Sequence, residues 1–160
     1  MRRLITIVCL IILCYPITSQ AGDWIVQEDV DEMTDEVERI FLCPSGGELN
    51  PIMQTDPVLM LEYQISEGSG LFITGLNCPM RGFISETELM IRFDRAEPFV
   101  TVWYPDGGSY SQTIRNYGNQ QLWADILDSE IMLIRVDNET WSFQVSGLQA
   151  LLSEYNIPIP

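Results

Sequence analysis

Apolar and polar residues alternate most regularly along residues 86–107. Leu89, Ile91 and Phe93 alternate with Glu88, Met90, Arg92 and Asp94, which is the period-two pattern of a strand with one face in a core. After a short turn, a β-branched and aromatic run leads to the turn signal that begins at Pro105. The pattern predicts a β-hairpin near the centre of the fold.

Other segments carry the same signal. Apolar residues alternate along residues 58–65, and the glycine-bearing turn at 67–70 leads into a second apolar run at 71–74. Residues 131–136 and 141–145 form another pair of alternating runs around a short polar turn. The chain therefore contains at least three predicted hairpins.

A short amphipathic helix is predicted after the last strand. Ser146 stands three residues before Gln149, which is the spacing of a capping box. The apolar residues that follow at helical spacing are Leu148, Leu151, Leu152 and Tyr155. The predicted fold is mainly β, with a single antiparallel β-sandwich or rolled-sheet domain and a short C-terminal α-helix.

Residues 1–21 have the pattern of a secretory signal peptide. Arg2 and Arg3 precede an apolar run, and small residues around Ala21 match a cleavage site. The apolar run is shorter than the roughly 20 residues that span a bilayer. We expect residues 22–160 to form one β-rich domain of a periplasmic or secreted protein, without stable membrane insertion after cleavage.

Cys43 and Cys78 are the two cysteines of the expected mature chain. In an oxidising compartment two cysteines most often pair, so we predict a disulfide between them. Closing a loop of this length would stabilise the fold by about 4 kcal/mol in the chain-entropy description. The alternative is a pair of buried thiols.

The chain is strongly acidic, with 23 acidic and eight basic residues and a net charge of −15. Nucleic acid and anionic lipid surfaces are therefore poor partners. Eight carboxylates lie between residues 23 and 38, among apolar residues that suggest a docked segment. We predict an acidic binding face, suited to a basic protein surface or loosely held cations, formed by Asp29, Asp31, Asp35 and Glu36.

The acidic segment does not match a calcium loop. Counted from Asp29, an EF-hand would need glycine and glutamate where Thr34 and Ile40 stand. No metal site and no cofactor is predicted.

The chain contains neither histidine nor lysine. Their absence excludes Ser-His-Asp and Cys-His nucleophilic sites, Ser-Lys dyads, Schiff-base chemistry and histidine-ligated zinc. A pair of carboxylates remains able to cleave a glycosidic bond, so a carboxylate-based glycan hydrolase of the cell envelope is the alternative function. The four tryptophans, which we expect mainly in the core, are Trp24, Trp103, Trp123 and Trp141.

Several short motifs occur in an order that resembles the TagO-like (VasI) family of type VI secretion-associated periplasmic proteins. The matching pieces are Trp24-Ile25-Val26, Asp31-Glu32-Met33-Thr34-Asp35, a strand that ends in Cys78, Leu89-Met90-Ile91-Arg92-Phe93-Asp94 followed by Pro98, and Phe143-Gln144-Val145-Ser146-Gly147-Leu148. Cys43 and the low basic content depart from the family pattern.

The resemblance implies a small secreted β-rich domain with an accessory role and no catalytic residue. We therefore expect an exported non-enzymatic accessory or binding protein of the bacterial envelope. Its expected setting is type VI secretion, and its expected partner is another envelope protein.

Overall fold

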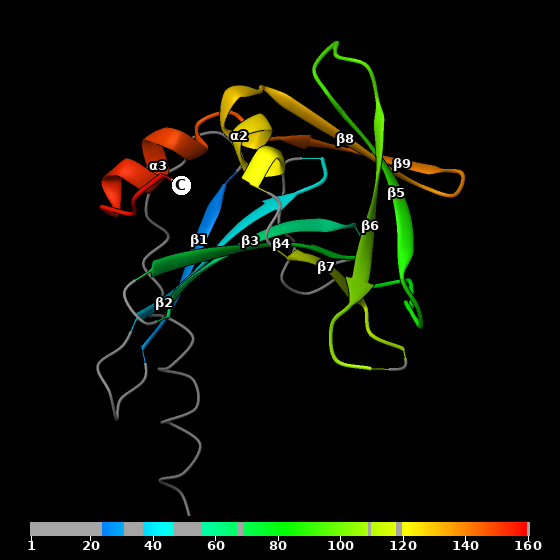
Figure 1. Ribbon diagram of the computed structural model, residues 1–160, viewed down its shortest axis with the longest axis horizontal. Coiled ribbons are helices and arrows are strands. Elements are labelled where there is room, and N and C mark those ends of the chain that lie inside the picture. Colours follow the sequence, from blue (N-terminus) through cyan, green and yellow to red (C-terminus); the bar gives the residue numbers. More distant parts are fainter. Residues whose placement is uncertain are drawn as a thin grey trace, which may run out of the picture.

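The computed structural model describes residues 24–30, 37–46, 56–66, 69–108, 110–117 and 120–159, so the predicted signal peptide lies outside the described part. Nine strands form one antiparallel sheet in the order β1-β2-β3-β4-β7-β6-β5-β8-β9 (Figure 1). Their bounds are β1 Ile25–Val30, β2 Val37–Pro44, β3 Val58–Ser66, β4 Ser69–Asn77, β5 Thr87–Phe93, β6 Phe99–Pro105, β7 Thr113–Tyr117, β8 Ile131–Val136 and β9 Glu139–Gln144. The mainly β prediction is confirmed.

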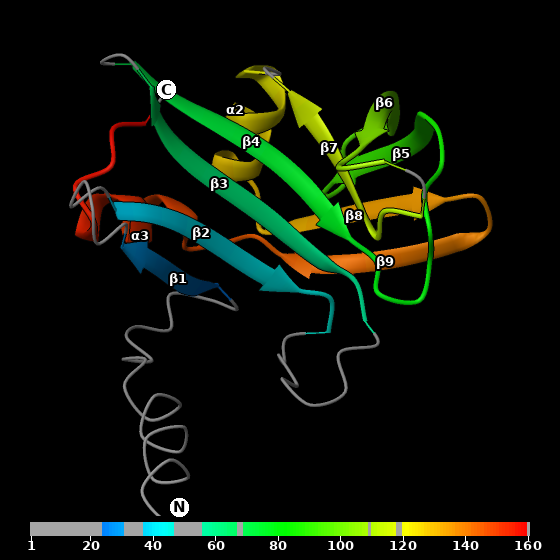
Figure 2. The ribbon, with the colours of Figure 1, turned by 90° about the horizontal axis from the view of Figure 1, so that it is seen from below.

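The sheet is rolled, and β1 and β9 are its two ends. In Figure 1, β8 and β9 lie above β1 to β4, and Figure 2 shows the strands of these two parts running in different directions. The indole Nε1 of Trp24, just before β1, donates a hydrogen bond of 3.0 Å to the Val145 carbonyl, just after β9. The sheet therefore encloses its core without closing into a barrel.

The alternating patterns predict which side chains enter this core. Leu89, Ile91 and Phe93 of β5 are buried, as predicted, and their neighbours along the strand are exposed. Trp24, Trp103 and Trp123 are buried too, and Trp141 is partly buried against the same core. Burying this apolar surface is the main stabilising contribution to such a fold.

Two short helices lie on the side of the fold away from the β5–β6 hairpin (Figure 1). The predicted C-terminal helix is α3 (Leu148–Glu154), whose apolar side chains join the core. The predicted capping box is wrong: the N-cap is Gly147 in the left-handed region at φ 86°, and no side chain caps the helix. Sequence patterns did not predict α2 (Gln120–Asp128), which buries Leu122 and Ile126.

Asp94 fixes the distant strand β8 beside β5. Its backbone N–H donates to the Ile131 carbonyl at 2.9 Å, and its carboxylate Oδ1 accepts from the N–H groups of Glu130 and Ile131 at 3.1 and 2.8 Å. Asp94 adopts a φ of 45°, which aspartate tolerates better than most residues. Asp94, directly after β5, thus fixes the start of β8.

The roll depends on a narrow junction between β6 and β7. These strands pair only at Tyr104 with Arg115 and at Pro105 with Ile114 in the described part of the chain. The Arg115 guanidinium contacts Glu62 Oε2 through Nη1 at 2.7 Å and Asp106 Oδ2 through Nη2 at 2.8 Å. It therefore joins β3, β7 and the segment that follows β6.

Arg115→Gln is expected to lower the free energy of unfolding by about 3 kcal/mol or more, because the Glu62 carboxylate stays buried without this guanidinium. The side chains of Arg115 and Glu62 are 18% and 9% exposed. Urea unfolding followed by circular dichroism measures the change.

Arg39→Gln is the matched control, since Arg39 also bonds a carboxylate at 2.7 Å but the side chains of Arg39 and Glu28 are 25% and 41% exposed. Loss of this more exposed ion pair should lower the free energy of unfolding by at most about 1 kcal/mol. Equal losses in the two variants would contradict a structural role for the Arg115 contacts.

Candidate functional site

A pocket of about 320 Å³ lies beside the β8–β9 turn. This volume is at the lower end of the roughly 300–1,000 Å³ that small-molecule sites occupy. Its lining comes from the start of β3, the loop after β4 and strand β9, and consists of Asp56, Pro57, Cys78, Met80, Arg81, Glu139 and Trp141. Three separate chain segments therefore build one concave site.

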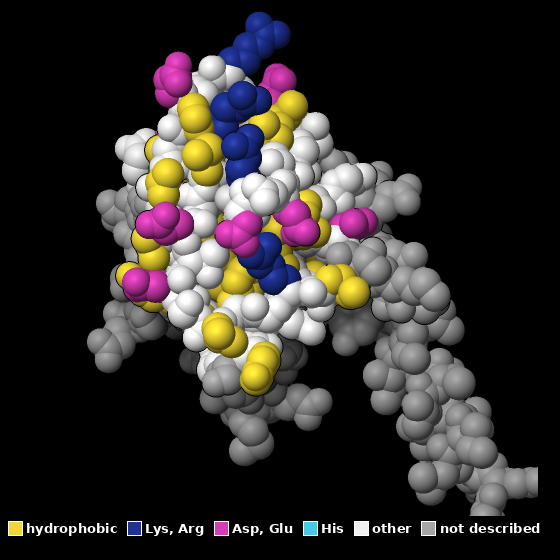
Figure 3. All heavy atoms as spheres, turned by 90° about the vertical axis from the view of Figure 1, so that its right-hand side faces the viewer, with side chains coloured by type: hydrophobic (Ala, Val, Ile, Leu, Met, Phe, Trp, Pro, Cys, Tyr) yellow, Lys and Arg dark blue, Asp and Glu magenta, His cyan; other side chains and the backbone are white. Residues whose placement is uncertain are grey.

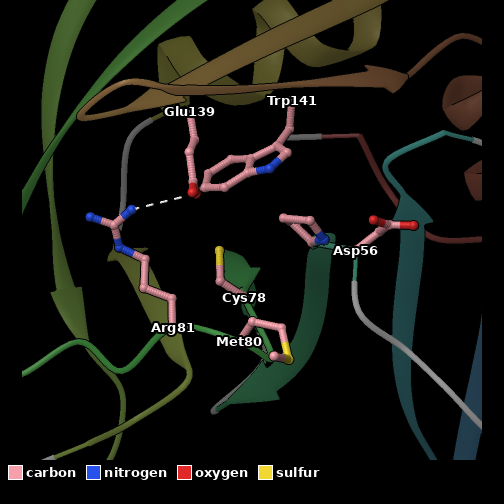
Figure 4. Close-up of a pocket in the computed structure, with 7 residues that line it drawn as sticks. Asp56, Cys78, Met80, Arg81, Glu139 and Trp141 are labelled. Carbon is pink, nitrogen blue, oxygen red and sulfur yellow. Dashed lines mark ion pairs between the residues drawn. The ribbon is translucent and has the colours of Figure 1, made fainter.

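Arg81 is the charged group on one side of this pocket. It forms ion pairs with Asp137 and with Glu139, the latter at 3.7 Å, and its guanidinium lies 5.5 Å from the centre of the Phe83 ring. Figure 4 shows Arg81 and Glu139 together on one side and Asp56 on the other. The two carboxylates that line the pocket are thus separated across it.

Cys78 is a buried part of the pocket lining, 3% exposed. Burial raises the pKa of its thiol from 9.0 to about 12, while the Arg81 charge acts in the opposite direction and the Glu139 charge adds to the rise. A thiol with this pKa stays protonated at neutral pH, and the protonated form is a poor nucleophile. The raised pKa therefore disfavours Cys78 as a nucleophile.

The predicted disulfide between Cys43 and Cys78 is not formed in the structure. Cys43 lies opposite Leu59, and Leu59 lies opposite Leu76, so two strand spacings separate Cys43 from the end of β4. Strands about 4.8 Å apart place the two cysteines roughly 10 Å apart or more, beyond the limit of about 7 Å between bridged Cα atoms. Cys43 instead donates a 3.3 Å hydrogen bond to the Gln144 carbonyl.

Both cysteines of the expected mature chain should therefore be thiols in unreduced protein. Iodoacetamide added after denaturation, without reductant, is expected to modify Cys43 and Cys78, because neither forms a disulfide in the structure. Intact mass spectrometry of a reduced sample serves as the control. A mass increase that appears only after reduction would show that the two cysteines do pair.

The raised pKa of Cys78 predicts a pH dependence of stability. The unfolded chain loses the proton near pH 9 and the folded protein near pH 12, so this contribution is present below pH 9 and is lost as the pH rises toward 12. Wild type should lose stability more steeply than Cys78→Ala from about pH 8 to about pH 11. Urea unfolding at each pH measures both slopes, and identical slopes would contradict burial of the thiol.

The predicted acidic binding face falls mostly outside the described residues. Asp31, Asp35 and Glu36 lie outside, and for Asp29 only the backbone is described, as part of β1 opposite Glu38. That face stays a prediction.

A second candidate surface, which the sequence did not predict, is the outer face of β6, β5 and β8. Met90 lies opposite Val100 on one side and opposite Arg135 on the other, and Arg92 lies opposite Leu133. Residues opposite each other in a sheet point to the same side, and Val100 and Met90 are 58% and 38% exposed. We call this surface, with Arg95 at the β5–β6 turn, the arginine face.

The arginines of this face differ from the others. Arg39, Arg81 and Arg115 each form an ion pair with a carboxylate. Among the described residues no carboxylate lies within ion-pair distance of Arg92, Arg95 or Arg135, although Arg135 donates a hydrogen bond to Thr140 Oγ1. Figure 3 shows basic side chains in a line down this side of the molecule, with hydrophobic side chains beside them and acidic side chains both at the upper end of the line and below it.

The sequence analysis predicted neither the pocket nor the arginine face, because both depend on contacts between segments that are distant in the sequence. Arg92 and Arg135 become diagonal neighbours, roughly 7 Å apart at the backbone, only when β5 pairs with β8. The available signal was the apolar residue Met90 on the polar side of the predicted strand. An outward apolar residue beside an arginine is a feature of binding surfaces.

No family model matches the chain, and no curated protein matches its sequence. Its structure is similar to the crystal structure of invasion associated protein B from Bartonella henselae, with a TM-score of 0.57 and 12% sequence identity. The similarity covers 86% of this chain and 92% of that chain. At this identity it establishes a shared fold.

Within the described residues, no helix is long and apolar enough to cross a membrane.

Proposed function

We propose that this protein is a non-enzymatic binding protein that docks a protein partner on its arginine face. The observation that carries the proposal is the position of Arg92, Arg95 and Arg135. In a chain with 23 acidic residues, these three arginines share one exposed surface and have no carboxylate partner among the described residues.

The chemistry of this surface supports protein binding. Arginine forms two parallel hydrogen bonds with a carboxylate and is enriched at interfaces, where it is often a dominant binding residue. Exposed Val100 and Met90, which lie in one cross-strand row with Arg135, add apolar area that a partner can cover. The fitting partner presents carboxylates interspersed with apolar side chains.

The predicted signal peptide supports a role in the bacterial envelope. The resemblance to the TagO-like (VasI) family supports an accessory role near a type VI secretion apparatus. The protein from Bartonella henselae carries the name invasion associated, and its similarity supports a shared fold.

The geometry favours binding over glycan hydrolysis. A hydrolase of this kind needs two carboxylates on either side of a bound sugar in a cleft. Glu139 of the pocket is paired with Arg81, and the Trp141 ring lies between Glu139 and Asp56 in Figure 4. The arrangement supports a small binding site better than an acid and a nucleophile.

The double variant Arg92→Gln with Arg135→Gln is expected to reduce partner affinity about tenfold or more, because both guanidinium groups are lost from the centre of the face. Immobilised wild type and variant are compared for capture from periplasmic extract, followed by quantitative mass spectrometry. The supporting result is a protein captured by wild type and depleted with the variant.

The control variant is Arg39→Gln, since Arg39 lies on β2 and is bonded to Glu28. Capture by this variant should match wild type. Raising the salt concentration should weaken capture, because exposed charges are screened over about 8 Å at physiological ionic strength. Capture that persists with the double variant and at high salt would refute the arginine face as the binding surface.

A further inference from the structure

The pocket beside the β8–β9 turn has a chemistry different from that of the arginine face. Figure 4 shows the Trp141 ring above, Met80 below and the Cys78 sulfur directed toward the space between them. Trp141 is partly buried, while Met80 is 81% exposed at the pocket's outer side. An aromatic ring and two sulfur-bearing side chains therefore form most of the apolar wall.

The charges around this wall are predominantly negative. The lining contains the carboxylates of Asp56 and Glu139 and one cation, Arg81. Arg81 is already held by Asp137 and Glu139, so its positive charge is offset within the site. Asp137 and Glu139 flank the Arg81 guanidinium, and Asp56 lies on the other side of the pocket, so the local charge is negative and attracts cations.

A cation with an apolar stem satisfies both parts of the site. Tryptophan is the side chain that best attracts a cation over its ring face, and the pocket places Trp141 between the two carboxylates. The buried thiol of Cys78 stays uncharged at neutral pH and accommodates a hydrocarbon stem. An anionic ligand would find Arg81 occupied by its two carboxylate partners.

We propose that this pocket binds an organic cation, namely an ammonium group on a short aliphatic stem, with the charge near Glu139 and the Trp141 ring and the stem against Met80 and Cys78. The cation is either a free small amine or the lysine side chain of a bound peptide. This site goes beyond the docking surface proposed above and does not depend on it.

The test uses the Met80 methyl group as a reporter, because Met80 lines the pocket and its NMR signal can be assigned with Met80→Leu. The protein is titrated with n-butylammonium, with 1-butanol and with butyrate, which share the stem and differ in charge. A fourth titration uses the peptide acetyl-Gly-Lys-Gly-amide. We expect saturable shifts with the two cations and none with the neutral or anionic compounds.

Glu139→Gln and Trp141→Leu should each weaken cation binding about threefold or more, because each removes one attraction for the ammonium group. Glu154→Gln removes an exposed carboxylate of α3 outside the pocket and should leave binding unchanged. Circular dichroism of each variant verifies the fold, and either pocket variant alone suffices if the other does not fold.

The titrations also identify the source of the cation. Saturation by n-butylammonium alone supports a free amine as the ligand, and saturation by the peptide alone supports a lysine of a protein. Equal shifts with 1-butanol, stronger binding of butyrate, or cation binding that both pocket variants retain in full would overturn the proposal.

Discussion

The contacts of Arg115 are the constraint on which the rolled sheet depends. Where β6 meets β7 the ladder is only two residue pairs long, yet this junction connects the two parts of the sheet. A short ladder holds its strands weakly, so the bonds from Arg115 to Glu62 and Asp106 fix the corner across three segments. At Gly75, which lies opposite Arg115 on β4, a Cβ atom would be 3.1 Å from Met60 Cε, so the end of that methionine would have to shift, and 3.7 Å from Arg115 Cγ, an ordinary contact.

The direction of this roll determines what each strand presents to solvent. Rolling turns Leu89, Ile91 and Phe93 toward the core, and the alternation of β5 then leaves Met90 and Arg92 outside. The same roll brings β9 near β2, where Cys43 bonds the Gln144 carbonyl, and it places Trp141 beside the loop that carries Cys78 and Arg81. The same bend thus leaves the arginine face exposed on the outside of the sheet and brings together the segments that line the pocket.

Local patterns predicted the hairpins, because neighbouring strands in sequence pair through a turn and each shows period-two alternation. They did not predict that β5 pairs with β8 or that β4 pairs with β7, since both pairings join segments that are distant in the sequence. The disulfide prediction rested on an oxidising compartment and on the presence of two cysteines in the expected mature chain. The strand register instead places Cys43 and the end of β4 two strand spacings apart. The short helix α2 carries no acidic residue in its first turn and no basic residue in its last, so its ends lack the usual charge signals.

The proposed surfaces make different demands on a partner. At long range the net charge of −15 repels polyanions and attracts proteins of positive net charge. At contact, Arg92 and Arg135 select carboxylates, while the pocket around Glu139 selects an ammonium group. Exposed charges are screened over about 8 Å at physiological ionic strength. A partner in contact with the arginine face therefore interacts mainly with these arginines and less with the net charge of the whole protein. A protein that used both surfaces would carry a lysine as well as carboxylates and apolar side chains, on a surface that is not acidic overall.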